Sequence, residues 1–143
     1  MNDPTRPPGY TFSQVRLLRA YYTLSDDAPF TPTGKLEYAY RDELKLQEGS
    51  FSVLQTLGAR IVDPIDPTLQ YLKAEVSVEG QFAAIGNENV SLQEFAEHHA
   101  PAILFAFTRE WLHRLTSSAG DWPPILLPPM NVLEMRKTQR QQG

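Results

Sequence analysis

The chain contains no cysteine among its 143 residues. A protein without thiols forms no disulfide, binds no metal through thiolates and has no cysteine nucleophile. The sequence also lacks any uninterrupted apolar run near the ~20 residues that a membrane-spanning helix needs. It shows no basic start followed by the apolar stretch of a signal peptide. These absences lead us to expect a cytoplasmic protein that does not insert into a membrane.

Positive charge is also scarce. The chain has 13 lysines and arginines against 17 aspartates and glutamates, for a net charge of −4. Nucleic-acid binding needs a basic stripe on a folded face, so we expect no nucleic-acid partner.

Catalytic and metal-binding patterns are missing too. The adjacent His98 and His99 would point about 100° apart on a helix, which does not suit a shared metal. The sequence has no glycine-rich phosphate loop, nucleophile elbow or metalloprotease motif. We therefore predict that the protein is not an enzyme and uses no metal or cofactor.

Alternation of apolar and polar residues predicts four strands in residues 13–86, after a flexible arm at 1–11. The phase of the alternation changes within 13–24, which indicates a bulge. The segments 35–46 and 51–62 are joined by "QEGS", a hairpin turn, and "DPIDP" forms the next loop. In the fourth strand, Gly80 marks a second bulge. Short connections favour a four-stranded antiparallel meander.

Helical periodicity replaces the alternation in residues 91–119. Ser91 and Glu94 form a capping box, which predicts a helix start. Pro101 then ends or kinks this first segment and opens a second helix, which Gly120 closes. The second helix has apolar residues on two faces, so it has two surfaces to cover. We expect one face to pack on the sheet and the other, with Phe105, Trp111 and Leu112, to contact another subunit.

The segment "GDWPPILLPPMN", residues 120–131, combines four prolines with five large apolar residues. Proline restricts the backbone and removes a hydrogen-bond donor, so this segment is a stiff extended strap. Such a strap either covers a core or lines a groove. Residues 132–143 form a short helix or tail. The whole chain is then a single α+β domain, a four-stranded antiparallel sheet with a long C-terminal helix packed on it.

The helix and strap together resemble a known family. The stretch "HHAPAILFAFTREWLHRLTSSAGDWPPILLPPMN" is similar to the C-terminal half of the SecB family of export chaperones. Upstream, "FTPTGKLEY" and "LKAEVSVEGQFAAIG" resemble the family's second and fourth strands, so the resemblance runs from Phe12 to Asn131. The matching residues of the C-terminal half are Pro101, Ile103, Leu104, Phe105, Arg109, Glu110, Gly120, Pro123, Pro124, Leu127, Pro128, Pro129 and Asn131.

This resemblance implies an ATP-independent holdase that binds unfolded or nascent proteins in apolar grooves. It also implies a homotetramer, assembled as a dimer of dimers. The strap would form one wall of a groove, although an extended segment points alternate side chains in opposite directions, so Ile125 and Leu127 would either line the groove or cap the core. The residues predicted to bind clients are Phe30, Leu36, Tyr38, Trp122, Leu126 and Met130.

Two departures from the family concern its partner, the SecA motor. The family docks SecA on an acidic patch of the sheet, and at those positions this chain has Lys73 beside Glu75. The C-terminal tail of this chain is also short and basic. We therefore expect weak or absent SecA binding. The alternatives are a SecB-like chaperone of a toxin–antitoxin system and a non-catalytic adaptor for one protein partner. An enzyme or small-ligand carrier is disfavoured because polar site residues are missing.

Overall fold

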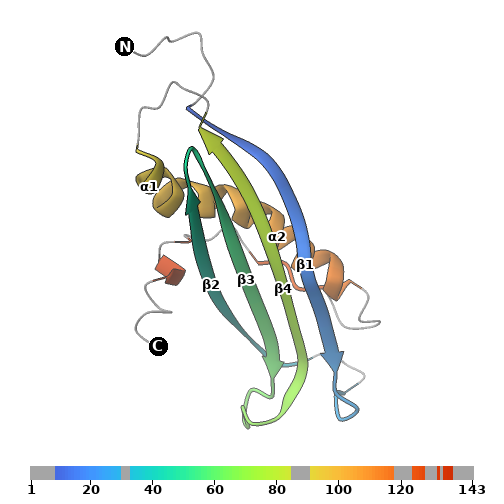
Figure 1. Cartoon of the computed structure of the whole chain (residues 1–143). Coiled ribbons are helices and arrows are strands. Elements are labelled where there is room, and N and C mark those ends of the chain that lie inside the picture. Colours follow the sequence, from blue (N-terminus) through green and yellow to red (C-terminus); the bar gives the residue numbers. More distant parts are fainter. Residues whose placement is uncertain are drawn as a thin grey trace.

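The structure is a computed structural model that describes residues 9–29, 33–84, 91–117, 124–127, 132 and 134–136. Four long strands form one twisted antiparallel sheet, and a helix lies across one face of it (Figure 1). The strands are β1 (Tyr10–Leu24), β2 (Lys35–Gln47), β3 (Ser50–Val62) and β4 (Gln70–Ala84). The predicted α+β fold class is confirmed.

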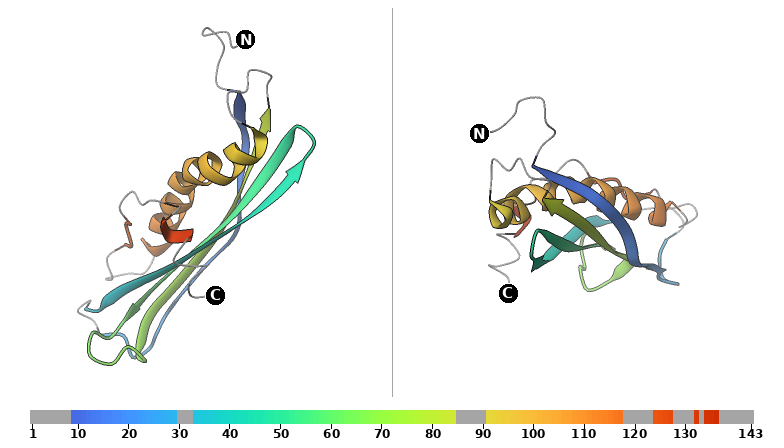
Figure 2. Two further views of the ribbon diagram at one scale, coloured as in Figure 1. Left: turned by 90° about the vertical axis from the view of Figure 1, so that its left-hand side faces the viewer. Right: turned by 45° about the horizontal axis from the view of Figure 1, so that its top comes forward.

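The strand order is β1-β4-β3-β2. Only β2, β3 and β4 therefore form a meander, while β1 pairs with β4 instead of its neighbour in sequence, β2. Both β1 and β2 are edge strands, at opposite sides of the sheet (Figure 2). The pairing of β1 begins at Tyr10, opposite Ala84, so the last two residues of the expected arm belong to the sheet.

Two register shifts interrupt the pairing of β1 with β4. One lies between Phe12 and Gln14, and the other between Leu17 and Arg19. The second shift coincides with the phase change in the sequence, so the predicted bulge is confirmed. It gives Leu18 no partner of its own and leaves its side chain exposed.

Helical structure is continuous from Leu92 to Thr116. It comprises α1 (Leu92–Glu94), the π-helical turn η1 (Phe95–His99) and α2 (Ala100–Thr116). The start is as predicted, because the Ser91 hydroxyl accepts a hydrogen bond from the Glu94 amide at 3.2 Å. Pro101 does not separate two helices. It lies in the first turn of α2, directly after the wider turn η1.

The core lies between the sheet and α2, and Gly80 decides how closely they approach. A Cβ atom on Gly80 would lie 2.9 Å from Leu104 Cδ1. Gly80 pairs in register with Val15 and Val53, so it is not the predicted bulge. The glycine is needed instead because Leu104 packs directly on the backbone of β4.

Candidate functional site

The described part of the strap, residues 124–127, alternates between the core and solvent. Ile125 and Leu127 are buried in the core cluster that includes Leu57 and Leu112. Leu126, between them, is 66% exposed. The Ile125 amide donates a hydrogen bond to the Thr116 hydroxyl at 2.8 Å, which ties the strap to the end of α2. Of the two roles left open for Ile125 and Leu127, the structure shows that both cap the core.

Two more exposed apolar side chains lie on β2, on the sheet face that carries α2. Leu36 is 41% exposed and Tyr38 is 46% exposed. In register they stand opposite Ile61 and Ala59 of β3. Ala59 belongs to the cluster that includes Ile125 and Leu127 of the strap, and Ile61 packs against it. We call Leu36, Tyr38 and Leu126 the apolar surface, because each is open to solvent and directly neighbours one of these residues in register or in sequence.

The structure does not reach every residue predicted to bind clients. Phe30, Trp122 and Met130 lie outside the described residues. The remaining three are the apolar surface. Their role in client binding therefore remains a prediction.

A buried polar network holds β2 and β3 against the helix. Gln55, fully buried, donates through Nε2 to the Pro101 carbonyl at 2.6 Å and to the Tyr40 hydroxyl at 2.9 Å. Its Oε1 accepts from the Thr108 hydroxyl at 2.8 Å. The Tyr40 hydroxyl in turn donates to Asp42 at 2.6 Å. Burial, together with this hydrogen bond to Asp42, raises the pKa of Tyr40 well above its usual range.

The network also includes Arg136, which the sequence analysis placed in a basic tail. Its guanidinium lies 2.7 Å from an Asp42 oxygen and donates to the Glu97 carbonyl, also at 2.7 Å. Both charged side chains are largely buried. The sequence analysis missed this pair. The only sequence signal is Asp42 itself, an acidic residue on the otherwise apolar phase of its strand.

The predicted subunit interface requires a correction. Phe105 and Leu112 are buried within the subunit, where Phe105 makes an edge contact with Tyr40, at 6.1 Å between ring centroids. They cannot form a free second face, because their stripe, together with Leu104, Thr108 and Thr116, packs on the sheet. Trp111 is half-buried, with Arg114 over its ring.

The exposed large apolar residues of α2 are instead Ile103 and Phe107, each 42% exposed. Phe107 also meets Phe12 of β1 edge-on at 5.3 Å. Apolar periodicity misassigned the faces, because the buried stripe also contains two threonines, Thr108 and Thr116. Both hydroxyls bond to helix carbonyls one turn back, which permits their burial.

Lys73 and Glu75, which stand at the predicted positions for SecA docking, lie on the sheet face opposite α2, which we call the outer face. Lys73 is exposed, and Glu75 forms an ion pair with Arg19 at 3.0 Å. Burial by itself would raise the pKa of Glu75. Hydrogen bonds from Tyr21 and Arg19 and the positive charge of Arg41 have the larger combined effect, so the pKa of Glu75 lies below its usual value. SecA docking at these positions stays a prediction.

Across the ranges that the structure describes, no three His, Cys, Asp or Glu side chains come together as a metal site. Within the same ranges, no helix combines the length and the apolar character that crossing a membrane requires. Asp63, in the loop between β3 and β4, accepts three hydrogen bonds. Bonds from Tyr71, Asp66 and Ile65 lower its pKa, and all three serve to shape the loop between β3 and β4.

The sequence is similar to parts of two known proteins. The chain is 34% identical over 77 residues to a protein-export protein SecB of Ehrlichia chaffeensis, a match that covers 48% of the chain and 43% of that relative. It is 38% identical over 60 residues to an uncharacterized protein of Methanocaldococcus jannaschii, covering 42% of the chain and 38% of that protein. The chain thus matches less than half the length of these curated relatives.

A solved structure shares the fold. It is a SecB-like chaperone of Mycobacterium tuberculosis in complex with a peptide from the HigA1 antitoxin, with a TM-score of 0.68 and 16% identity. The likeness covers 85% of this chain and 90% of the other. The model of the family described as preprotein translocase subunit SecB matches residues 28–143. This match spans most of the chain, so the protein belongs to the SecB family, which consists of chaperones and not of enzymes.

Proposed function

We propose that the protein is an ATP-independent holdase of the cytoplasm, which binds unfolded polypeptides through the apolar surface of Leu36, Tyr38 and Leu126. The observation that carries the proposal is the alternation of the strap. Leu126 is held out to solvent because its two neighbours are anchored in the core. The same segment therefore stabilises the fold and offers an apolar side chain to a client.

The physical properties of this surface suit a chaperone. Apolar contact is non-directional, so it accepts many sequences. A strap that is already fixed loses little conformational entropy when a client binds. The strap also offers few backbone donors for β-pairing, because it is rich in proline.

The source of the clients is a finer part of the proposal. The family description and the relative from Ehrlichia chaffeensis support a role in protein export. The solved SecB-like chaperone with its antitoxin peptide supports the alternative, a chaperone of a toxin–antitoxin system. Lys73 beside Glu75 favours weak SecA binding, because a lysine opposes a partner that complements negative charge. The sequence also left open an adaptor for one partner protein, and the experiment below distinguishes a holdase from such an adaptor.

The test is the aggregation of several unrelated, chemically reduced proteins in the presence of the full chain. We expect suppression for most of them at comparable molar concentrations. The double variant Tyr38→Ser with Leu126→Ser should suppress less, since each lost apolar contact weakens binding by about 1 to 2 kcal/mol. Ile65→Ser is the matched control, because Ile65 is also exposed and apolar but lies in the loop between β3 and β4.

Two results would contradict the proposal. Protection of a single protein from the panel would indicate an adaptor. Equal suppression by the double variant and by the Ile65 control would place client binding elsewhere on the molecule.

A further inference from the structure

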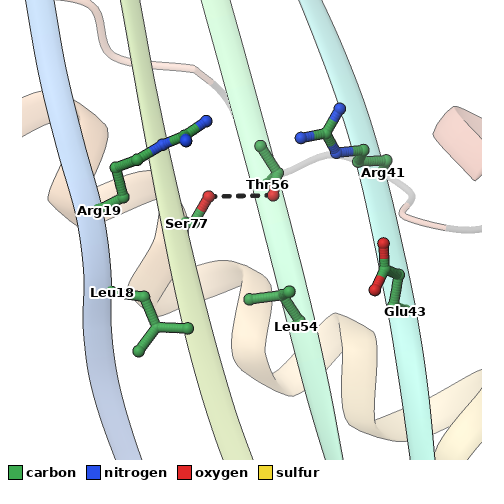
Figure 3. Close-up of a pocket in the computed structure, with 7 residues that line it drawn as sticks. All are labelled: Leu18, Arg19, Arg41, Glu43, Leu54, Thr56 and Ser77. Carbon is green, nitrogen blue, oxygen red and sulfur yellow. Dashed lines mark hydrogen bonds between the residues drawn. The ribbon is translucent and has the colours of Figure 1, made fainter.

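The outer face of the sheet is hollowed. One hollow of about 350 Å³ lies over the middle of the strands and is lined by residues of all four (Figure 3). A second of about 420 Å³ follows it along the strands, over Gly58 and Ala39. On β3, Leu54 and Thr56 line the first hollow, whereas Gly58 and Arg60 line the second. The two hollows therefore follow each other along β3. Tyr38 of the apolar surface borders the second hollow but not the first.

The first hollow has two arginines at one end and two leucines at the other, and Glu43 also lines it from β2. Figure 3 shows the guanidinium groups of Arg19 and Arg41 extending toward each other from the two edge strands. Leu18 and Leu54 likewise extend toward each other, farther along the strands. The bulge in β1 makes this arrangement, because it brings the consecutive residues Leu18 and Arg19 to the same hollow.

The floor between the two ends is polar. The hydroxyls of Thr56 and Ser77 are hydrogen-bonded to each other at 3.1 Å, and both side chains are buried. These short side chains leave room above them, whereas the arginines of the two edge strands are long. The result is a shallow channel between two edges.

On this face some of the charged side chains form ion pairs and others do not. Ion pairs join Arg19 to Glu75 at 3.0 Å and Arg60 to Glu37 at 2.7 Å. For Arg41, no ion pair is found within the described chain. The charge of Arg41 nevertheless acts across the hollow, because it lowers the pKa of Glu75 and opposes the rise in the pKa of Tyr21. Arg41 therefore faces the hollow outside any described ion pair, and so does Glu43, two residues along the same strand.

We propose that this hollow binds an extended acidic segment of a partner protein. A carboxylate of that segment lies between Arg19 and Arg41, and an apolar side chain two residues away lies between Leu18 and Leu54. Arginine forms paired hydrogen bonds with a carboxylate, which fits the charged end. An extended chain places every second side chain on one side, about 7 Å apart, which is also the spacing between Thr56 and Leu54 along β3. This docking site goes beyond the proposed holdase function.

The test uses a fluorescein-labelled peptide, Ser-Leu-Ser-Glu-Ser-Gly, and its twin with glutamine in place of glutamate. Fluorescence anisotropy with the full chain should show saturable binding of the glutamate peptide, and about tenfold weaker binding of the glutamine twin. Arg41→Gln should weaken the glutamate peptide by a similar factor and leave the twin unchanged. Lys45→Gln is the matched control, since Lys45 is another cation of β2 but does not line the hollow.

Three results would overturn the proposal. They are the absence of saturable binding up to about 1 mM peptide, equal affinity for the two peptides, and equal effects of Arg41→Gln and Lys45→Gln. The double variant Tyr38→Ser with Leu126→Ser separates this proposal from the holdase function. It should reduce the suppression of aggregation while leaving peptide affinity unchanged, and Arg41→Gln should do the reverse. If the double variant abolishes peptide binding, that result also contradicts a peptide site on the outer face.

Discussion

Arg136 shows how the surroundings of a single residue decide its role. By sequence it belongs to a run of basic and polar residues near the C-terminus, which suggests solvent exposure. In the structure its neighbour Met135 is buried, and its guanidinium joins Asp42 in a polar network that reaches Gln55 and α2. No local pattern encodes this contact, because the two partners are 94 residues apart in the chain.

Replacing Arg136 tests the energetic role of this network. Arg136→Ala should destabilise the fold by about 3 kcal/mol, because it leaves the Asp42 carboxylate buried without a counter-ion. Arg114→Ala removes an exposed ion pair with Glu110 and a contact with the Trp111 ring, and should cost only about 1 kcal/mol. Urea unfolding followed by circular dichroism measures both. Equal unfolding midpoints for the two variants would mean that Asp42 does not depend on Arg136.

At the scale of elements, the strands could be predicted well and the helix faces could not. Period-two alternation located all four strands because each has one face against the core. Strand order escaped prediction, since the pairing of β1 with β4 depends on contacts distant in sequence. The buried face of α2 was misassigned because two threonines lie in it. In the strap, alternation alone correctly predicted that Leu126 faces away from the core. It did not decide whether Ile125 and Leu127 line a groove or cap the core.

The packing of α2 on the sheet should make two glycines of the sheet differ in how well they tolerate replacement by alanine. Gly80→Ala should destabilise the protein by about 1 to 3 kcal/mol, because the new Cβ overlaps Leu104 in a packed core. At Gly58 a Cβ would meet nothing closer than 3.8 Å, so Gly58→Ala should be neutral or slightly stabilising. Thermal unfolding of both variants compares them directly. A Gly80→Ala protein as stable as Gly58→Ala would show that helix and sheet can separate without cost.

At the scale of the whole molecule, the exposed apolar residues of α2 suggest how subunits meet. We propose that Ile103 and Phe107, rather than Phe105 and Leu112, carry the subunit contact expected from the family. Apolar residues that a lone subunit leaves open to water are typically covered in an oligomer. Whether the assembly is a dimer or the expected tetramer, this face should be part of it.

Sedimentation velocity tests this assignment. The unmodified chain should sediment as an oligomer at micromolar concentration, and Ile103→Glu with Phe107→Glu should shift it to monomers. The control is Arg114→Glu, on the same helix but at an exposed polar position. Because Phe107 also contacts Phe12, circular dichroism must show that the double variant remains folded. An oligomer that persists in the folded double variant would assign the contact to another face.

The position of β1 beside β4 has a consequence for synthesis of the chain. Tyr10 pairs with Ala84, and Leu24 with Leu72, so β1 leaves the ribosome long before its partner exists. At about 5 to 20 residues per second, the first strand waits several seconds, whereas β2 and β3 can form their hairpin at once. During that interval the apolar residues of β1, among them Phe12, Val15 and Leu17, have no sheet to cover them. The nascent chain of this protein therefore passes through the same exposed, extended state as the polypeptides it is proposed to protect.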